Sequence, residues 1–462
     1  MVQRADGLVV FGATGDLAKR SLFPALHELQ RRGRLDIPVV GVARSEWSDD
    51  KLRAYAKSSI EQFAPHGLDQ SAFDALAKNL HYVRGEYHHP QTYERLKKAL
   101  AGAEHPLAYL AIPPSVFDDV IDGLAKAGLN QGGRICVEKP FGRDLASARE
   151  LNACVLNAFD EEDIFRMDHF LGKESVLDML VFRFDNLILE PVWNRHYISN
   201  VQITLAEDFG VEGRGSFYEE VGALRDVVQN HLLELVMLVA MEPPAAPDAH
   251  ALRDEKVKVL RAMRSIDPKN VVRGQYIGYR KEAGVAPDSN VETYLALCAY
   301  IDNWRWAGVP FFIRAGKKLE KTATEVVVEF QEPPRPLFRD SKNRRPERNH
   351  FTFRVKPDEG LGLTVQIKES GDAVVSAPVE LRYAYDENRE NLEETAYERL
   401  LGDAIDGDPS LFARADVIEE AWRVVMPVIE HPSKICPYDA GTWGPQEADT
   451  VPESGWHEPT TA

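Results

Sequence analysis

The chain has 462 residues, of which 44% are apolar and 28% are charged, a composition typical of globular proteins. This length exceeds one ordinary hydrophobic core, so we expect two domains. The 55 basic and 73 acidic residues give a net charge of −18. This charge argues against general affinity for nucleic acid or anionic lipid, because both require a basic surface. It does not exclude an anionic small molecule bound by a local basic cluster.

The sequence lacks the features of a membrane or secreted protein. The longest apolar run, LLELVMLVAM (232–241), contains Glu234 and is half the length of about 20 residues that a bilayer span needs. The N-terminus has no signal-peptide pattern. The four cysteines are scattered without a CxxC pair, which disfavours metal or disulfide use. We therefore expect a cytoplasmic protein with no metal site and no nucleic-acid or membrane partner.

Residues 7–44 have the pattern of one βαβ unit. The apolar runs GLVVF (7–11) and IPVVGVA (37–43) suit parallel strands that are buried on both faces. Leucines at helical spacing lie between the two runs, and Gly33 stands where a helix C-cap would be. Pro24 predicts a late start or a bend in this helix, because proline cannot donate to the helical hydrogen-bond ladder.

The turn from Gly12 to Gly15 is a GxxGxxA variant of a phosphate-binding loop. Glycine lets the backbone approach a pyrophosphate, and the following helix N-terminus favours its charge. Two glycines also suit any tight strand-to-helix turn, so the loop alone leaves both interpretations open. Arg44, at the end of the second run, favours the 2′-phosphate of NADP over the ribose hydroxyls of NAD. Glu46, two residues after Arg44, weakens this preference for NADP over NAD.

Two further segments, HPLAYLAIPPSVF (105–117) and GGRICVEKPFG (132–142), each predict a strand followed by a polar or proline-marked turn. Strands and helices alternate to about residue 165, so we expect a doubly wound parallel sheet with ligands at the carboxyl ends of its strands. Tyr109 to Pro114 and Lys139 lie at these ends. A solvated loop position is the alternative interpretation of Lys139.

The segment RMDHFLGKE (166–174) gathers Arg166, Asp168, His169 and Lys173 just before a helical pattern. His169 and Lys173 can share a helical face if the first turn includes both. Free amides, a positive helix end and two cationic donors favour an anion, most naturally a phosphate monoester. An ordinary helix cap with surface charges is the alternative.

A broad apolar helical face follows in VGALRDVVQNHLLELVMLVAM (221–241), and His231 falls on it. An inward histidine is often a satisfied core residue. As a catalytic base it needs a carboxylate that holds its tautomer and stabilises the imidazolium, and Asp168 is a candidate.

The remaining chain predicts a second domain of the α+β class. Helical runs are expected between its strands, including NVETYLALCAYIDNWRW (290–306), and the Pro- and Arg-rich segment 333–349 predicts an exposed loop. Four alternating stretches suit antiparallel strands: 201–209, 323–332, 349–355 and 361–369.

The motifs GATGDLAKR, YLAIPP, EKPFG and RMDHFLGKE occur in this order, followed by EDFGVEGRG, LRDVVQNHLLELV, IDNWRWAGVPFFIRAGKKL and YDAGTWGP. In sequence and order they resemble the glucose-6-phosphate dehydrogenase family over nearly the whole chain. The resemblance implies a Rossmann-like NADP-binding domain at 1–168. It also implies an α+β domain for substrate binding and oligomerisation at 169–462, with a large, mostly antiparallel sheet and packed helices.

The resemblance further implies the reaction and the assembly. β-D-Glucose 6-phosphate is oxidised at C1 to 6-phospho-D-glucono-1,5-lactone with hydride transfer to NADP⁺, the first step of the oxidative pentose phosphate pathway. The protein is expected to be a homodimer or a homotetramer.

Residue roles are implied in the same way. His231 is the catalytic base, and Asp168 orients it. Substrate contacts fall on residues of five motifs, and Lys139 is placed between substrate and nicotinamide. They are His169, Lys173, Glu207, Asp226, Lys317 and Lys139. Cofactor contacts fall on the loop and strand ends: Gly12, Ala13, Thr14, Gly15, Asp16, Leu17, Arg44, Tyr109 and Lys139.

Two positions depart from the family pattern. Phe170 replaces the tyrosine of the usual signature RIDHYLGKE, and Ser21 stands where relatives often carry a basic residue. A hydrogen bond to a charged group contributes about 1.5–3 kcal/mol, so we expect weaker substrate binding. Two alternatives to this function are another NADP-dependent sugar dehydrogenase with an EKP motif and a non-catalytic NADPH-binding regulator.

Overall fold

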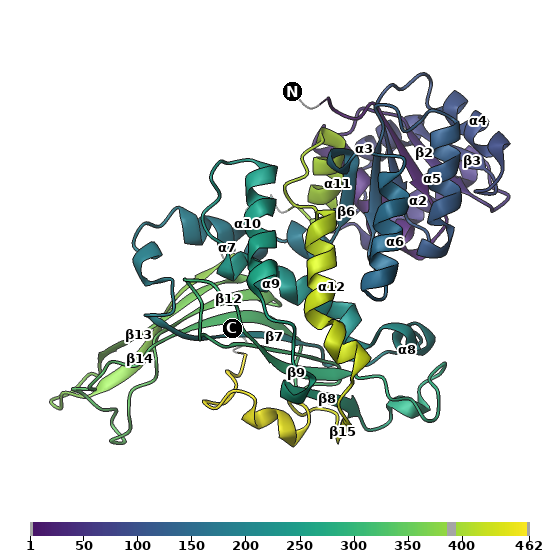
Figure 1. The fold of residues 1–462 in the computed structure, drawn as a ribbon. Helices are drawn as coiled ribbons and strands as arrows, with labels where there is room; N and C mark the ends of the chain where they lie inside the picture. Colours follow the sequence, from purple (N-terminus) through teal and green to yellow (C-terminus); the bar gives the residue numbers. More distant parts are fainter. Residues whose placement is uncertain (1–2, 386–393, 460–462) are drawn as a thin grey trace. The chain divides into compact units, whose positions relative to one another are not determined.

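The computed structural model describes residues 3–385 and 394–459 and divides into two compact units (Figure 1). Unit 1 comprises Met1–Lys173, Ala245–Arg253 and Glu393–Glu419. Unit 2 comprises Glu174–Pro244, Asp254–Leu392 and Glu420–Ala462. Each unit has its own sheet.

Unit 1 contains a six-stranded parallel sheet in the order β3-β2-β1-β4-β5-β6. The chain starts in the middle, moves outward to β3 and returns to β4, which confirms the doubly wound fold. In such a sheet the ligand crevice opens at the carboxyl ends of the two central strands, β1 and β4. The strands are β1 Gly7–Phe11, β2 Val39–Ala43, β3 Leu80–Arg84, β4 Pro106–Leu110, β5 Arg134–Glu138 and β6 Ile164–Met167.

Helices connect the strands of unit 1. The first helical stretch contains a π-helical turn, η1, that continues directly into α1, so the residues before Pro24 are already helical and the late start that Pro24 predicted is not observed. Gly33, with φ +70°, follows the C-cap Arg32. The elements are η1 Ala18–Leu22, α1 Phe23–Arg31, α2 Asp49–Phe63, α3 Gln70–Asn79, α4 Pro90–Ala99, η2 Pro114–Val116, α5 Phe117–Lys126, α6 Leu145–Leu156, η3 Glu161–Asp163 and η4 His169–Gly172.

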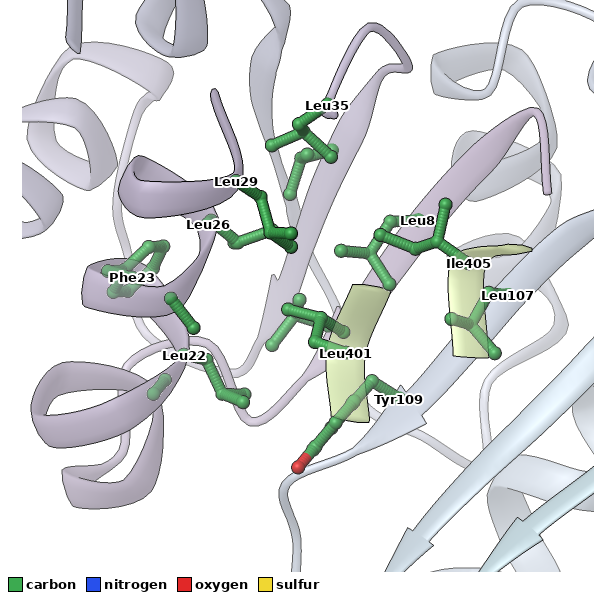
Figure 2. Packing of buried hydrophobic residues seen from close by; sticks show 14 of the residues in the cluster. Leu8, Leu22, Phe23, Leu26, Leu29, Leu35, Leu107, Tyr109, Leu401 and Ile405 are labelled. Atoms are coloured by element: carbon green, nitrogen blue, oxygen red, sulfur yellow. The ribbon is translucent and has the colours of Figure 1, made fainter. Parts of the chain in front are cut away.

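One helix from late in the chain, α11 (Ala396–Asp406), completes the core of unit 1. Leu401 and Ile405 belong to the same buried cluster as Leu8 and Leu107 of the central strands (Figure 2). The backbone N–H of Ala5 also donates to the carbonyl of Ile405 at 2.7 Å. The nucleotide-binding fold is therefore built from both ends of the sequence.

Unit 2 contains a nine-stranded sheet in the order β14-β13-β12-β11-β7-β10-β9-β8-β15. The pairs β7–β10 and β8–β15 are parallel, and the other pairs are antiparallel, which confirms a mostly antiparallel sheet. The strands are β7 Ile198–Ala206, β8 Val271–Tyr276, β9 Tyr294–Ala299, β10 Phe311–Gly316, β11 Ala323–Phe330, β12 His350–Lys356, β13 Gly360–Lys368, β14 Ser376–Ala384 and β15 Ile435–Tyr438.

The helices of unit 2 include α9, in which all eight residues are buried. Two helices, α10 and α12, have residues in both units. Among the described residues, no helix is long and apolar enough to span a bilayer. The elements are α7 Glu174–Phe184, η5 Glu190–Val192, α8 Gly215–Ala223, η6 Leu224–Leu232, α9 Leu233–Ala240, α10 Ala249–Ala262, η7 Pro268–Asn270, η8 Tyr279–Lys281, α12 Ala415–Glu430 and η10 Gln446–Thr450.

The helix expected at 290–306 is wrong, because this segment forms β9 (Tyr294–Ala299) and a following turn. Strand β9 lies between β8 and β10, and five of its six residues are buried. A strand covered on both faces has a continuous apolar sequence, and YLALCA therefore lacks the alternation that marks a half-exposed strand. The loop expected at 333–349 is confirmed, since these residues form neither helix nor strand.

Candidate active site

The glycine loop of unit 1 depends on Gly12 for two separate reasons. Its φ is +81°, a backbone conformation that favours glycine, and an added Cβ would lie 2.1 Å from the carbonyl oxygen of Ala111. The N–H of Gly15 donates to the carbonyl of Gly12 at 2.9 Å and closes the turn. The loop thus brings bare backbone to the switch point between β1 and β4, where a pyrophosphate would bind.

Arg44 leaves the carboxyl end of β2, next to this loop. Its side chain is exposed, and its backbone is fixed on both sides because the Tyr82 hydroxyl donates to the carbonyls of Ala43 (3.1 Å) and Ser45 (2.7 Å). The Ser45 hydroxyl donates to Thr14 Oγ1 at 3.4 Å. The arginine predicted for a 2′-phosphate therefore stands beside the loop predicted for the pyrophosphate.

Tyr109 lies inside the core of unit 1. Its hydroxyl donates to the Glu138 carboxylate and lies 3.0 Å from Met167 Sδ. Burial raises the pKa of Glu138 to about 7, although the Tyr109 hydroxyl and the charge of Lys139 oppose this rise. The Tyr109 side chain is fully buried, and its contact with a cofactor stays a prediction. Lys139 directly follows β5 at the predicted ligand edge of the sheet.

The segment RMDHFLGKE does not place His169 and Lys173 in one helical turn, so the condition for a shared helical face is not met. A short 3₁₀ turn, η4, ends at Gly172, and Lys173 is extended with φ −77° and ψ 140°. The Asp168 carboxylate accepts from the Phe170 N–H at 2.9 Å and caps this turn. His169 therefore lies in a 3₁₀ turn and Lys173 in extended backbone, and the two do not share one α-helical turn.

His169 and Lys173 each lie beside an aromatic ring within unit 1. The imidazole stacks on the Tyr397 ring of α11, with centroids 6.0 Å apart and an angle of 9° between the planes. The Lys173 ammonium lies 5.5 Å from the centroid of the buried Phe170 ring. Arg166 pairs with Glu161 instead: its buried guanidinium donates to both carboxylate oxygens of Glu161, at 2.7 and 3.0 Å.

Glu207, Asp226 and Lys317 all lie in unit 2. Glu207 and Lys317 follow the paired strand ends Ala206 and Gly316, and Lys317 Nζ lies 2.5 Å from Glu207 Oε2. Lys317 and Asp226 line one cavity, and the lysine also lies over the rings of Phe209 and Tyr218 at 5.4 and 5.2 Å. The other lining residues are Gly210, Val211, Glu212, Arg214 and Phe217.

This cavity in unit 2 has the chemistry of a carbohydrate site. Carboxylates and an ammonium group can bind hydroxyls, and the aromatic rings supply apolar surface. Burial, followed by the charge of Asp226, raises the pKa of Tyr218 well above its ordinary value, so its hydroxyl stays protonated. Two residues that sequence analysis assigned to sugar binding, Asp226 and Lys317, therefore line one pocket, and the third, Glu207, is paired with Lys317.

His231 lies in η6 of unit 2 and is 3% exposed. Its inward position is confirmed. Asp168 belongs to unit 1, and its partnership with His231 stays a prediction.

Two family models together cover most of the sequence. Residues 9–178 match the glucose-6-phosphate dehydrogenase NAD binding domain, and residues 180–457 match the glucose-6-phosphate dehydrogenase C-terminal domain. The chain belongs to the glucose-6-phosphate dehydrogenase family.

Individual members of this family are similar to the chain over its full length. Glucose-6-phosphate 1-dehydrogenase 1 of Mycobacterium bovis is 45% identical, with 98% of this chain and 97% of the relative aligned. The crystal structure of glucose-6-phosphate 1-dehydrogenase from Mycobacterium avium has a TM-score of 0.91 at 45% identity, and both chains are covered completely. A glucose-6-phosphate dehydrogenase in complex with glucose 6-phosphate has a TM-score of 0.92 at 34% identity, again with complete coverage.

The structure adds residues that sequence analysis did not assign to the glucose-6-phosphate dehydrogenase site. Phe209 and Tyr218 contact Lys317; Phe209 lies in the motif EDFGVEGRG that already pointed to the family, and Tyr218 lies three residues after it. Glu138, the acid that ends strand β5, is part of the motif EKPFG. The position of Tyr397 beside His169 could not be predicted from sequence, because this contact depends on how α11 folds within unit 1.

Proposed function

We propose that this chain oxidises β-D-glucose 6-phosphate at C1 to 6-phospho-D-glucono-1,5-lactone, with NADP⁺ as the hydride acceptor. Membership of the family supports the reaction. The observation that carries the assignment is Lys317, which pairs with Glu207 and lines one polar and aromatic pocket together with Asp226. We assign NADP binding to residues 1–168, and substrate binding and oligomerisation to residues 169–462.

The residues of unit 1 fit a dinucleotide. Gly12 packs its backbone so closely on Ala111 at the end of β1 that no Cβ fits there, and the exposed Arg44 stands next to the loop. Gly12 to Leu17 would hold the pyrophosphate, and Arg44 the 2′-phosphate. When bound, NADP⁺ supplies the electrophilic nicotinamide carbon, and Lys139 at the end of β5 would lie between nicotinamide and sugar.

His231 acts as the general base in this proposal. It takes the proton of the C1 hydroxyl while the C1 hydrogen leaves with its electron pair, and the C1–O bond becomes the lactone carbonyl. A histidine suits this step because its ordinary pKa lies near neutrality. Asp168 holds the imidazole in the required tautomer and stabilises the imidazolium.

The remaining residues orient the sugar. His169 and Lys173 bind the 6-phosphate through charge-assisted hydrogen bonds. Glu207, Asp226 and Lys317 bind the hydroxyls of the ring. Because the phosphate and the ring are held at opposite ends, C1 can be presented to the base in one orientation.

The test follows the absorbance of reduced nicotinamide with glucose 6-phosphate or free glucose, and with NADP⁺ or NAD⁺. The proposal requires turnover with glucose 6-phosphate, faster with NADP⁺, and its loss in His231→Asn. Turnover on free glucose would instead indicate another sugar dehydrogenase. A folded protein that binds NADPH but turns over no pair would indicate a non-catalytic regulator.

We also propose that the protein is cytoplasmic and assembles as a homodimer or homotetramer. The edge strand β14 supports assembly, because Leu381 and Tyr383 are 59% and 49% exposed, and Ile367 on the neighbouring β13 is 49% exposed. Apolar side chains beside a sheet edge are commonly covered by a partner. Sedimentation at micromolar concentration tests this proposal, and a monomer at every concentration would contradict it.

A further inference from the structure

An ion pair links the two strands at the outer edge of the cofactor side of unit 1. Arg84 is the last residue of β3, and Glu46 lies two residues after Arg44 on the segment that follows β2. Arg84 Nη2 lies 2.5 Å from Glu46 Oε1. The pair forms where β2 and β3 run parallel with Ala43 opposite Arg84, so both side chains emerge at the carboxyl ends of neighbouring strands.

The backbone around this pair is held firmly. The Tyr82 hydroxyl binds the carbonyls on both sides of Arg44, and the Trp47 ring packs against Tyr82 at 6.2 Å and Tyr55 at 5.0 Å. The backbone N–H of Trp47 donates to the backbone carbonyl of Ser45 at 2.9 Å. Arg44 and Glu46 are therefore presented from one fixed turn.

Glu46 stands in the region where a 2′-phosphate would meet Arg44. NAD sites use an acid at the end of the second strand to accept hydrogen bonds from the ribose hydroxyls, and the same charge repels a 2′-phosphate. Exposed ion pairs contribute little to folding stability, and these side chains are 55% and 77% exposed. A contribution to folding stability therefore does not account for the Arg84–Glu46 pair, whereas an effect on the binding of a negatively charged ligand does.

We propose that Arg84 is a specificity-determining residue for NADP. By pairing with Glu46 it neutralises and holds the carboxylate that would otherwise repel the 2′-phosphate. Arg44 can then bind that phosphate without a competing acid. The inference rests on the proposed position of the 2′-phosphate at Arg44.

The test measures equilibrium binding of NADP⁺ and of NAD⁺ by calorimetry, at low ionic strength, where exposed charges are least screened. Arg84→Gln should weaken NADP⁺ binding about three- to tenfold, the size expected when one charge is left unpaired near a phosphate in water, and leave NAD⁺ binding within about twofold. Arg84→Gln combined with Glu46→Gln should restore NADP⁺ binding to within about twofold of the wild type.

Two outcomes overturn the inference. Arg84→Gln could leave the ratio of NADP⁺ to NAD⁺ affinity unchanged, or the double variant could bind NADP⁺ as weakly as Arg84→Gln alone. Lys126→Gln is the matched control, because it removes one exposed positive charge from unit 1 at a residue paired with Asp122. Unchanged thermal unfolding of each variant shows that binding, not folding, is measured.

Arg44→Gln separates failure of the inference from failure of the proposed cofactor position. If Arg44→Gln weakens NADP⁺ binding and Arg84→Gln does not, the 2′-phosphate binds at Arg44 as proposed, and the role inferred for Arg84 is wrong. If Arg44→Gln leaves NADP⁺ binding unchanged, the position itself is wrong, and the inference falls with it.

Discussion

Replacing Glu138 with Gln should change the pH dependence of stability in unit 1. Glu138 is 9% exposed, and its carboxylate accepts from the Tyr109 hydroxyl. Glutamine has nearly the same volume and keeps an acceptor for that hydroxyl, but it carries no charge at any pH. The substitution therefore removes the titration and retains most of the packing.

The magnitude follows from the raised pKa of Glu138. Burial raises this pKa from 4.5 to about 7, and a tenfold change in a protonation equilibrium corresponds to about 1.4 kcal/mol. The folded state binds the proton more tightly than the unfolded state. The stability that this proton provides is therefore complete below pH 4.5 and is lost as the pH rises through 7, by about 3 kcal/mol in total.

Thermal unfolding of the wild type and of Glu138→Gln between pH 5 and 8 tests this prediction. The wild type should lose several degrees relative to the variant as the pH rises, since 1 kcal/mol corresponds to a few degrees in a unit of this size. Glu162→Gln, at a residue with a 77% exposed side chain in unit 1, controls for the loss of a surface charge. A difference between wild type and Glu138→Gln that stays constant with pH would refute the reasoning.

Three further predictions concern binding and packing. Phe170→Tyr should lower the KM for glucose 6-phosphate about tenfold by restoring a hydroxyl beside the phosphate, and an unchanged KM in initial-rate assays would contradict this. Leu401→Ala should destabilise unit 1 by about 3 kcal/mol because this residue is 1% exposed, whereas Leu337→Ala, at a 79% exposed residue, should have little effect in urea unfolding. Lys317→Met should raise the same KM more than about tenfold by leaving Glu207 without its partner, and Lys318→Met, outside the pocket lining, should change it less than about threefold. Equal effects of the two lysine variants would exclude a specific role for Lys317.

The features that sequence predicted correctly have local causes. The doubly wound sheet could be predicted because the buried strands β1, β2 and β4 are short apolar runs followed by a turn. The turn at Gly12 and the helix end at Gly33 could be predicted because only glycine adopts their positive φ values readily. The sugar-binding roles of Glu207, Asp226 and Lys317 stay predictions from the family motifs; the structure pairs Glu207 with Lys317 and places Lys317 and Asp226 in the lining of one cavity.

The features that sequence missed depend on tertiary context. The run YLALCA in β9 is apolar at nearly every position, and such a run is compatible with a buried helix or a buried strand. The separation of His169 from Lys173 depends on a 3₁₀ turn that ends one residue too early for a shared face. Tyr397 reaches His169 only because Gly172 allows α11 to approach, where an added Cβ would lie 2.6 Å from the carbonyl oxygen of Ala396.

The participation of α11 in unit 1 also has a consequence for synthesis on the ribosome. The strands β1 to β6 emerge first, but the core cluster that contains them is completed by Leu401, Ile405 and Phe412. The nascent nucleotide-binding fold must therefore wait, with apolar surface uncovered, until most of the second unit has been translated. Chains that stall before residue 396 should be substrates for chaperones and proteases rather than free-standing nucleotide-binding domains.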